Sequence, residues 1–326
     1  MHKTMPLFKP IIVLLIPFTI VFNAHTMHDN PHVLIIPGIK SWENNQEYIA
    51  KIIGVPTNNT TQLTSCYFPF ADLGQENCIK PIKSQLQSTQ YTNNCLIYAI
   101  SQGTATLLNY LGNPKNTNKT NRIKCLILEA VLASSNSAIE HTISNKLKLK
   151  CLMRLPFAYY WMPYLSKVPY PFYSPAGIQP IKSIEHIPLD IPIILIHAQR
   201  DPVLSYNDAC ALYYRLKLIG HNKIYFINTL DKQHAKLLES YQDKQKIIRQ
   251  ILNTHNIIKS DEDFTADLSP YQPDQEQFKN AYENLMHKEK NHEFIASPRF
   301  FYPLLGTLAT TTIALSWIMW KYNQLV

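Results

Sequence analysis

Hydrophobic residues gather in short runs between residues 31 and 253, and stretches with helical spacing separate most of these runs. Within the runs, Ile, Val, Leu, Tyr and Cys occupy consecutive positions rather than alternate ones. Consecutive apolar positions are typical of strands buried on both faces, as in a parallel sheet covered by helices. Six such runs begin at His32, Gln62, Cys95, Ile123, Ile191 and Lys223. The pattern predicts an α/β domain with a mostly parallel sheet of about six strands and helices on both faces.

Helical patterns follow the first, third and fifth runs, at residues 41–53, 102–111 and 205–220. Gly112 and Gly220 lie where two of these helices should end, and helix ends often take a left-handed residue, for which glycine is suited. This alternation predicts βαβ units, and right-handed crossovers would wind them into one open sheet.

One interval, residues 134–188, interrupts the alternation with many aromatic residues and prolines and no strand period. Such an insertion would lie at the carboxyl end of the sheet, where open α/β sheets bind ligands. We interpret it as a lid whose aromatic side chains line an apolar substrate pocket. The predicted substrate-binding side chains are Tyr159, Tyr160, Trp161 and Tyr164. The alternative is a packing insert without substrate contact, because aromatic residues also serve ordinary cores.

The amino-terminal segment is apolar and short. Residues 11–22 carry no charge and follow Lys3 and Lys9, which fits the hydrophobic region of a secretory signal better than a full membrane span. We expect residues 1–24 to be a signal peptide or an uncleaved signal anchor, and a buried first helix is the alternative.

The carboxyl-terminal segment is apolar and longer. Residues 303–320 carry no charge and are about long enough to cross a bilayer, with aromatic side chains on both flanks. They predict a transmembrane helix that contacts membrane lipid; an amphipathic or core helix is the alternative. Residues 254–300 are polar and predict a linker followed by a short helix at about 275–290. The chain is therefore expected to be membrane-anchored, with its α/β domain on the exported side.

Composition narrows the function classes. The chain is 46% hydrophobic and 17% charged, which allows a large core and excludes global disorder. Its net charge is +8, but the basic residues form no stripe, so we expect weak attraction to lipid headgroups and no nucleic-acid partner. The cysteines have no metal-binding spacing, and a Cys66–Cys78 bridge stays open for an exported domain. No metal or cofactor is predicted, because no H-E-x-x-H and no Gly-rich phosphate loop is present.

The main chemical signal is the sequence YAISQG at residues 98–103, between a predicted strand and a helix. A nucleophile on such a sharp turn has a strained backbone and needs small residues two positions before and after it. Ala99 and Gly103 meet this requirement and make Ser101 the candidate nucleophile. The Gln102 N–H would lie at the positive end of the following helix, where it could bind an oxyanion.

Three other segments follow predicted strands. Gly38 allows a tight turn that directs the Ile39 N–H toward the same oxyanion, although an ordinary strand-ending turn would look alike. Asp201 lies just beyond a buried strand and could orient an imidazole, or it could serve only its own turn. His234 lies in the loop after the last strand and could take the proton of Ser101 and return it to a leaving group.

Ser, then Asp, then His, each just after a strand, is the order of the α/β-hydrolase fold. This part of the chain resembles the α/β-hydrolase superfamily through the segments IIPGI, AISQG, IHAQRDPV and DKQHAKL. The resemblance implies that Ser101 is the nucleophile, Asp201 the acid and His234 the base. It also implies that Gln102 and Ile39 supply the oxyanion amides.

Three departures from the family pattern matter. Ala99 replaces the commoner first glycine, Pro37 stands where many members have histidine, and the two amino-terminal strands of larger members are missing. The resemblance implies a serine hydrolase that acts through an acyl-enzyme. The aromatic insert and the membrane tether favour an apolar acyl or lipid-like substrate, so we expect an esterase or lipase-like enzyme that cleaves carboxylic esters. A serine peptidase or amidase of the same fold, and a non-catalytic binding protein at the membrane, remain alternatives.

Overall fold

The computed structural model describes residues 31–38, 45–64, 72–87, 95–116, 122–146, 172–259 and 274–296. Within these residues six strands form one sheet: β1 His32–Ile36, β2 Thr60–Gln62, β3 Cys95–Ile100, β4 Ile123–Glu129, β5 Ile193–Ala198 and β6 Ile224–Thr229. Every neighbouring pair is parallel, and the order is β2-β1-β3-β4-β5-β6. The prediction of a mostly parallel sheet of about six strands is confirmed.

The sheet is buried on both faces, which explains the consecutive apolar positions. All six residues of β3 are buried, and their side chains alternate between two hydrophobic cores. Ile97 and Ala99 join one core, whereas Leu96, Tyr98 and Ile100 join the other.

The second strand departs most from its predicted position. β2 ends at Gln62, the residue at which the predicted run begins, and Leu63 and Thr64 lie outside the strand. β2 is a short edge strand that pairs only with β1, and edge positions carry a weaker apolar signal.

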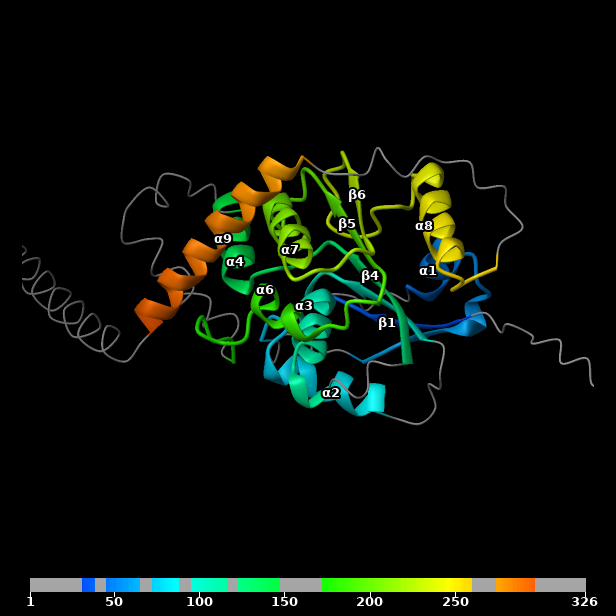
Figure 1. Cartoon of the computed structure of the whole chain (residues 1–326), viewed down its shortest axis with the longest axis horizontal. Helices are drawn as coiled ribbons and strands as arrows, with labels where there is room; N and C mark the ends of the chain where they lie inside the picture. The colour runs from blue at the N-terminus through cyan, green and yellow to red at the C-terminus, as the bar shows by residue number, and fades with distance from the viewer. Residues whose placement is uncertain are drawn as a thin grey trace, which may run out of the picture.

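Helices cover both faces of the sheet (Figure 1). On one face lie α1 Gln46–Ile53 and α8 Gln242–Thr254. The other face is covered by α2 Glu76–Gln87, α3 Gln102–Leu111, α6 Pro180–Ser183, α7 Tyr206–Leu218 and α9 Gln275–Ala296. α4 Ser135–Lys146 follows β4, and the short 3-10 turns include η1 Thr57–Asn59 and η4 Ile184–His186.

The helix α9 is a packed element of the domain. The sequence predicted a short polar helix at about 275–290 behind a linker, whereas α9 continues to Ala296 and lies along α7 (Figure 1). Phe278, Ala281 and Leu285 are buried in the same core as α3 and α7. This spacing of three and four residues gives the helix one apolar side.

Part of the predicted lid lies within the described residues. Residues 134–146 include α4, and residues 172–188 include α6 and η4. Ile181, Ile184 and Ile187 are buried in the core beside α3, so this part packs as core structure. The four aromatic residues predicted to bind substrate lie outside the described residues.

The two glycines expected at helix ends differ. Gly220 has φ +97°, as a left-handed helix end requires. Gly112 has φ −71°, so the expectation of a left-handed residue there was wrong. A Cβ atom on Gly112 would lie 1.8 Å from the Ser183 carbonyl oxygen, so close approach of α6 explains this glycine.

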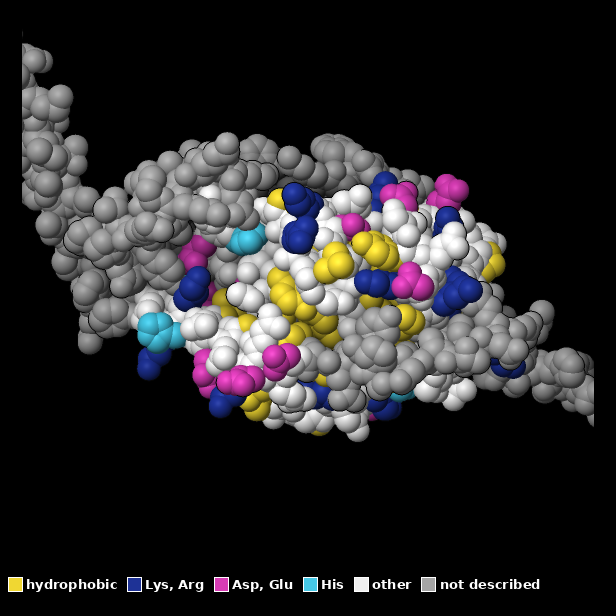
Figure 2. Space-filling view, turned by 90° about the horizontal axis from the view of Figure 1, so that it is seen from above, with side chains coloured by type: hydrophobic (Ala, Val, Ile, Leu, Met, Phe, Trp, Pro, Cys, Tyr) yellow, Lys and Arg dark blue, Asp and Glu magenta, His cyan; other side chains and the backbone are white. Residues whose placement is uncertain are grey.

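The apolar termini, residues 1–24 and 303–320, lie outside the described residues. No helix in the described part of the chain is long and apolar enough to cross a membrane. On the face seen in Figure 2, basic and acidic side chains are interspersed around a hydrophobic band.

Candidate active site

Ser101 lies on a strained turn between β3 and α3. Its backbone angles, φ 54° and ψ −122°, are costly for a residue with a side chain, and such strain is concentrated at functional sites. The Ser101 N–H donates to the Glu129 carbonyl oxygen at 2.8 Å, which fixes the turn against β4. A Cβ on Gly103 would lie 2.3 Å from the Ile36 carbonyl oxygen, so only glycine fits there. The predicted nucleophile turn is therefore present, including its need for a small residue two positions after the serine.

The loop after β1 comes close to the same serine. A Cβ on Gly38 would lie 3.0 Å from Ser101 Cβ and 3.5 Å from Ser101 Oγ. Strand order reverses between β1 and β3, because the chain passes from β1 outward to β2 and then back to β3. Ligands of open α/β sheets bind in the crevice at such a reversal, and Gly38 and Ser101 lie on its two sides.

Ser101, His234 and Asp201 form one chain of hydrogen bonds. Ser101 Oγ lies 2.7 Å from His234 Nε2, and His234 Nδ1 lies 2.9 Å and 3.0 Å from the two oxygens of Asp201. A carboxylate can only accept, so this network assigns the proton to Nδ1 and leaves Nε2 to accept the Ser101 O–H. The Asp201 side chain is fully buried, whereas that of His234 is 24% exposed.

The loop after β5 holds Asp201 as an anion. Asp201 Oδ1 accepts the N–H groups of Val203 at 2.7 Å and Leu204 at 2.9 Å. Burial by itself would raise the pKa of Asp201, but its hydrogen bonds and the nearby His234 and His197 lower the pKa below its ordinary value. The carboxylate is thus ready to stabilise a positive charge on the imidazole.

His197 has a separate, structural place. It lies on β5, fully buried, and its Nδ1 accepts the Val131 N–H at 2.9 Å. Burial lowers the pKa of His197 to about 4. This histidine is therefore neutral and fixes the loop after β4, while His234 is the one that contacts the serine.

The predicted oxyanion donors are only partly described. Gln102 is the first residue of α3, where backbone N–H groups have no partner within the helix. Its side chain is buried and donates to Cys78 Sγ at 2.6 Å. Cys78 is a free thiol, so the bridge to Cys66 considered from the sequence is not formed. Ile39, the second predicted donor, lies outside the described residues.

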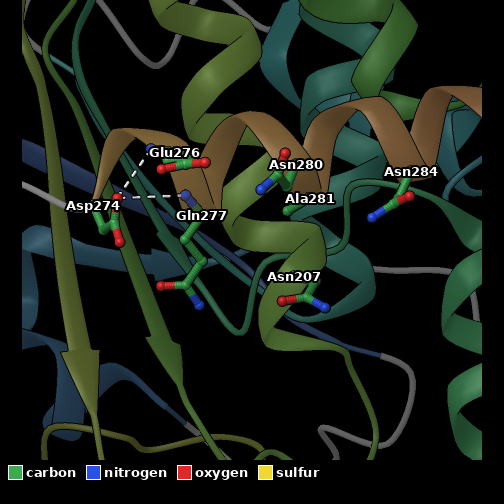
Figure 3. Close-up of a pocket in the computed structure, with 7 residues that line it drawn as sticks. All are labelled: Asn207, Asp274, Glu276, Gln277, Asn280, Ala281 and Asn284. Carbon is green, nitrogen blue, oxygen red and sulfur yellow. Dashed lines mark hydrogen bonds between the residues drawn. The ribbon is translucent and has the colours of Figure 1, made fainter.

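Two surface hollows in the described part of the chain lie away from this site. One of about 400 Å³ lies between the starts of α7 and α9 (Figure 3), and its lining residues are Asn207, Asp274, Glu276, Gln277, Asn280, Ala281 and Asn284. Asp274 caps α9 there by accepting the Glu276 N–H at 3.0 Å. The other, of about 370 Å³, lies between the end of α1 and α8. Neither hollow is lined by the serine, the histidine or the aspartate.

Sequence reasoning missed one buried acid at the rear of the site. Glu129 ends β4 and is fully buried. Its carboxylate accepts hydrogen bonds from Tyr98 Oη at 2.7 Å, Tyr48 Oη at 3.1 Å and the Leu237 N–H at 2.5 Å. The available signal was a lone acidic residue within the apolar run ILEAV, at the same strand end as the other site residues.

Comparisons with known proteins give distant structural likenesses. No protein-family model matches the sequence, and no curated protein does. An esterase of Pyrococcus furiosus is 11% identical, with 69% of this chain and 82% of that chain covered and a TM-score of 0.46. The mouse alpha/beta hydrolase domain-containing protein 10 is 12% identical, with coverage of 69% and 89% and a TM-score of 0.40. The acylaminoacyl peptidase of Pyrococcus horikoshii is 13% identical, with coverage of 59% and 29% and a TM-score of 0.36.

The fold follows from the features of this chain itself. Its parallel sheet reverses strand order at the point where a strained serine turn follows β3. The aspartate and the histidine follow β5 and β6, in the chain order that the fold requires. This chain therefore has the α/β-hydrolase fold that its sequence resembles.

Proposed function

We propose that this protein is a serine hydrolase that cleaves carboxylic esters through an acyl-enzyme. One observation carries the proposal: the unbroken hydrogen-bond chain from Ser101 through His234 to a buried, ionised Asp201. A non-catalytic protein of this fold has no need to keep a strained serine within 2.7 Å of an oriented imidazole.

The proposed reaction has two steps. His234 Nε2 accepts the Ser101 proton as Oγ attacks the ester carbonyl, and the backbone amides of Gln102 and Ile39 hold the oxyanion. When the tetrahedral intermediate collapses, the bond to the alkoxy oxygen breaks and His234 gives that oxygen its proton. Water then loses a proton to His234 and attacks the acyl-enzyme, which releases the carboxylic acid and restores Ser101.

Asp201 stabilises the positive charge that forms on His234 in both steps. Each step passes through an imidazolium on His234, and a buried anion 2.9 Å from Nδ1 stabilises that charge. The backbone N–H groups of Val203 and Leu204 keep the carboxylate in place and ionised. The proton consequently stays on His234 and is not passed to Asp201.

The proposed substrate has an apolar acyl group. This part of the proposal is supported by the aromatic sequence of residues 157–164, which includes Tyr159, Tyr160, Trp161 and Tyr164. We also propose that residues 303–320 keep the enzyme beside membrane lipid. Removal of residues 303–320 should release the protein from washed membranes.

The test is labelling with a fluorophosphonate probe, which reacts with activated serines. The full chain should be labelled, Ser101→Ala should not, and the exposed Ser84→Ala control should be labelled at the original rate. Hydrolysis of p-nitrophenyl esters should fall roughly 10⁴- to 10⁶-fold in Ser101→Ala. Labelled peptides cleaved in preference to matched esters would favour a peptidase. A wild-type chain that neither reacts with the probe nor cleaves esters would overturn the proposal.

A further inference from the structure

A buried carboxylate lies behind the proposed active site. Glu129 is the last residue of β4, in the middle of the sheet, with 0% of its surface exposed. An acidic side chain in such a position costs a large free energy unless hydrogen bonds compensate. The hydrogen-bond partners of Glu129 therefore indicate which parts of the structure depend on this carboxylate.

The side chain of Glu129 anchors the loop that carries the histidine. Its Oε1 accepts the Leu237 N–H at 2.5 Å, three residues after His234. Tyr48 from α1 donates to the same oxygen at 3.1 Å and accepts the Leu238 N–H at 3.2 Å. One backbone amide of the loop thus bonds to the buried acid directly, and the next is linked to the acid through the Tyr48 hydroxyl.

The backbone of Glu129 anchors the nucleophile turn. Its carbonyl oxygen accepts the Ser101 N–H at 2.8 Å, so one residue holds the serine turn with its main chain and the histidine loop with its side chain. The residues beside both anchors are strained: Ala130 has φ 51° and Lys236 has φ 58°. Such angles persist in residues with side chains only where neighbouring contacts impose them.

We infer that Glu129 is a positioning residue that sets the approach of His234 to Ser101 and places a second negative charge behind the imidazole. This inference rests on the proposed serine-hydrolase function. The Glu129 side chain has no hydrogen bond to the Ser101 hydroxyl or to the His234 imidazole, so it acts on them through the loop and through its charge.

The hydrogen bonds favour the ionised carboxylate. Tyr98, Tyr48 and the Leu237 amide all donate to Glu129, and a neutral acid would have to give up one of these bonds to direct its own O–H. Burial raises the pKa of Glu129, while the three hydrogen bonds and the nearby His234 act in the opposite direction.

Other titratable groups also face the imidazole. Asp201 from the loop after β5 contacts His234 directly, and His197 on β5 is within electrostatic range of both. Tyr48 on α1 and Tyr98 on β3 face Glu129 itself. Because Asp201 stays in place in the variants proposed below, changes in pH dependence report on Glu129.

The test separates the charge of Glu129 from its anchoring contacts. Glu129→Gln keeps the size and the acceptor for the Leu237 amide but removes the charge. We expect kcat to fall about tenfold with KM unchanged, and the acidic limb of the pH profile of kcat/KM to move to lower pH. Glu129→Leu also removes the anchor, and we expect a loss of about 100-fold, as for a misplaced catalytic group. Tyr98→Phe keeps the hydrogen bond from the Leu237 amide to Glu129, so its activity should fall by less than that of Glu129→Leu.

A second buried carboxylate provides the matched control. Glu289, on α9, is 1% exposed and hydrogen-bonded, but it faces α4 rather than the histidine loop. Glu289→Gln should keep the pH profile, even where it lowers the free energy of unfolding. Urea denaturation of each variant separates loss of folding from loss of positioning, and Glu129→Gln covers the case in which Glu129→Leu does not fold.

Two failures can be told apart. A folded Glu129→Gln with the wild-type kcat and pH profile would overturn the inference while the wild-type chain still reacts at Ser101. If the wild-type chain does not react with the fluorophosphonate probe, the proposed function fails, and with it the basis of the inference.

Discussion

Replacing Phe278 with alanine tests whether α9 belongs to the α/β domain. Phe278 is 2% exposed and packs edge-on against two aromatic rings, with centroid distances of 5.3 Å to Tyr213 on α7 and 5.1 Å to Phe226 on β6. The truncation removes both ring contacts and leaves a cavity between α9 and the sheet. If α9 were the polar end of a linker, the same change would matter little.

The expected loss follows from these contacts. A buried Phe→Ala change typically costs about 3–5 kcal/mol, of which two edge-to-face pairs account for roughly 1–3 kcal/mol. Total stabilities are about 5–15 kcal/mol, so the variant loses a large fraction of its free energy of unfolding. For a domain of this size, the midpoint of thermal unfolding should fall by about 6–20 °C.

Urea denaturation of the full chain gives the free energy directly. The control is Asn280→Ala, which lies on the exposed side of the same helix and should change the free energy of unfolding by less than about 0.5 kcal/mol. A loss below about 1 kcal/mol for Phe278→Ala would refute the assignment of α9 to the core.

Three further predictions concern strain, close packing and pH. Ser101→Gly and Ser101→Ala should both abolish ester hydrolysis, but the glycine variant should be about 1 kcal/mol more stable in urea, because it relieves the strain at φ 54°. Gly112→Ala should destabilise by about 1–3 kcal/mol in thermal unfolding, because its Cβ meets the Ser183 backbone; a gain in stability would show that no such contact exists. Burial raises the pKa of Asp208 to about 7, so its stabilising contribution is complete below pH 4 and is lost as the pH rises through 7. Asp208→Asn should therefore gain stability relative to wild type as the pH rises from 5 to 8, by about 3 kcal/mol, in urea titrations at both pH values.

The sheet could be predicted from the sequence because strands that are buried on both faces consist of consecutive apolar residues. β3 and β5 are buried at every position, and each coincides with a run of consecutive apolar residues. β2 is a three-residue edge strand with partly exposed positions, and no apolar run marks it. The helix α3, all of whose residues are buried, was predicted, whereas α2 and α8 were not, because polar residues outnumber their apolar ones.

The site residues could be chosen because of a property of parallel sheets. The carboxyl ends of all six strands meet at one edge, so side chains just after β3, β5 and β6 are brought together whatever their distance in sequence. The order Ser101, Asp201, His234 was therefore informative. Glu129 lies at the same edge as the last residue of β4, but its partners Tyr48 and Leu237 come from segments that no local pattern relates to it.

The packing of α9 was not predicted because average polarity hides a narrow stripe of apolar residues. Charged and amide side chains dominate its 22 residues, and its buried apolar positions, Phe278, Ala281 and Leu285, are few. Three apolar residues on one side are enough when the partner surface is aromatic, because each ring buries a large area. For a helix of this kind, the spacing of the apolar residues therefore predicts burial better than the overall composition does.

The same helix is joined to α4 through polar contacts. Ser134 and Asn136, beside the start of α4, both donate to the buried carboxylate of Glu289 on α9. Further along α4, His141 Nε2 donates to the Asp201 carbonyl oxygen at 3.1 Å. Buried polar groups of this kind are costly when one partner is lost, so the Glu289 contacts fix α9 to α4, and the His141 contact separately fixes α4 to the backbone of the loop after β5. A helix that looks like a connection to the carboxyl-terminal segment is thus held to the domain by polar contacts as well as by its apolar side.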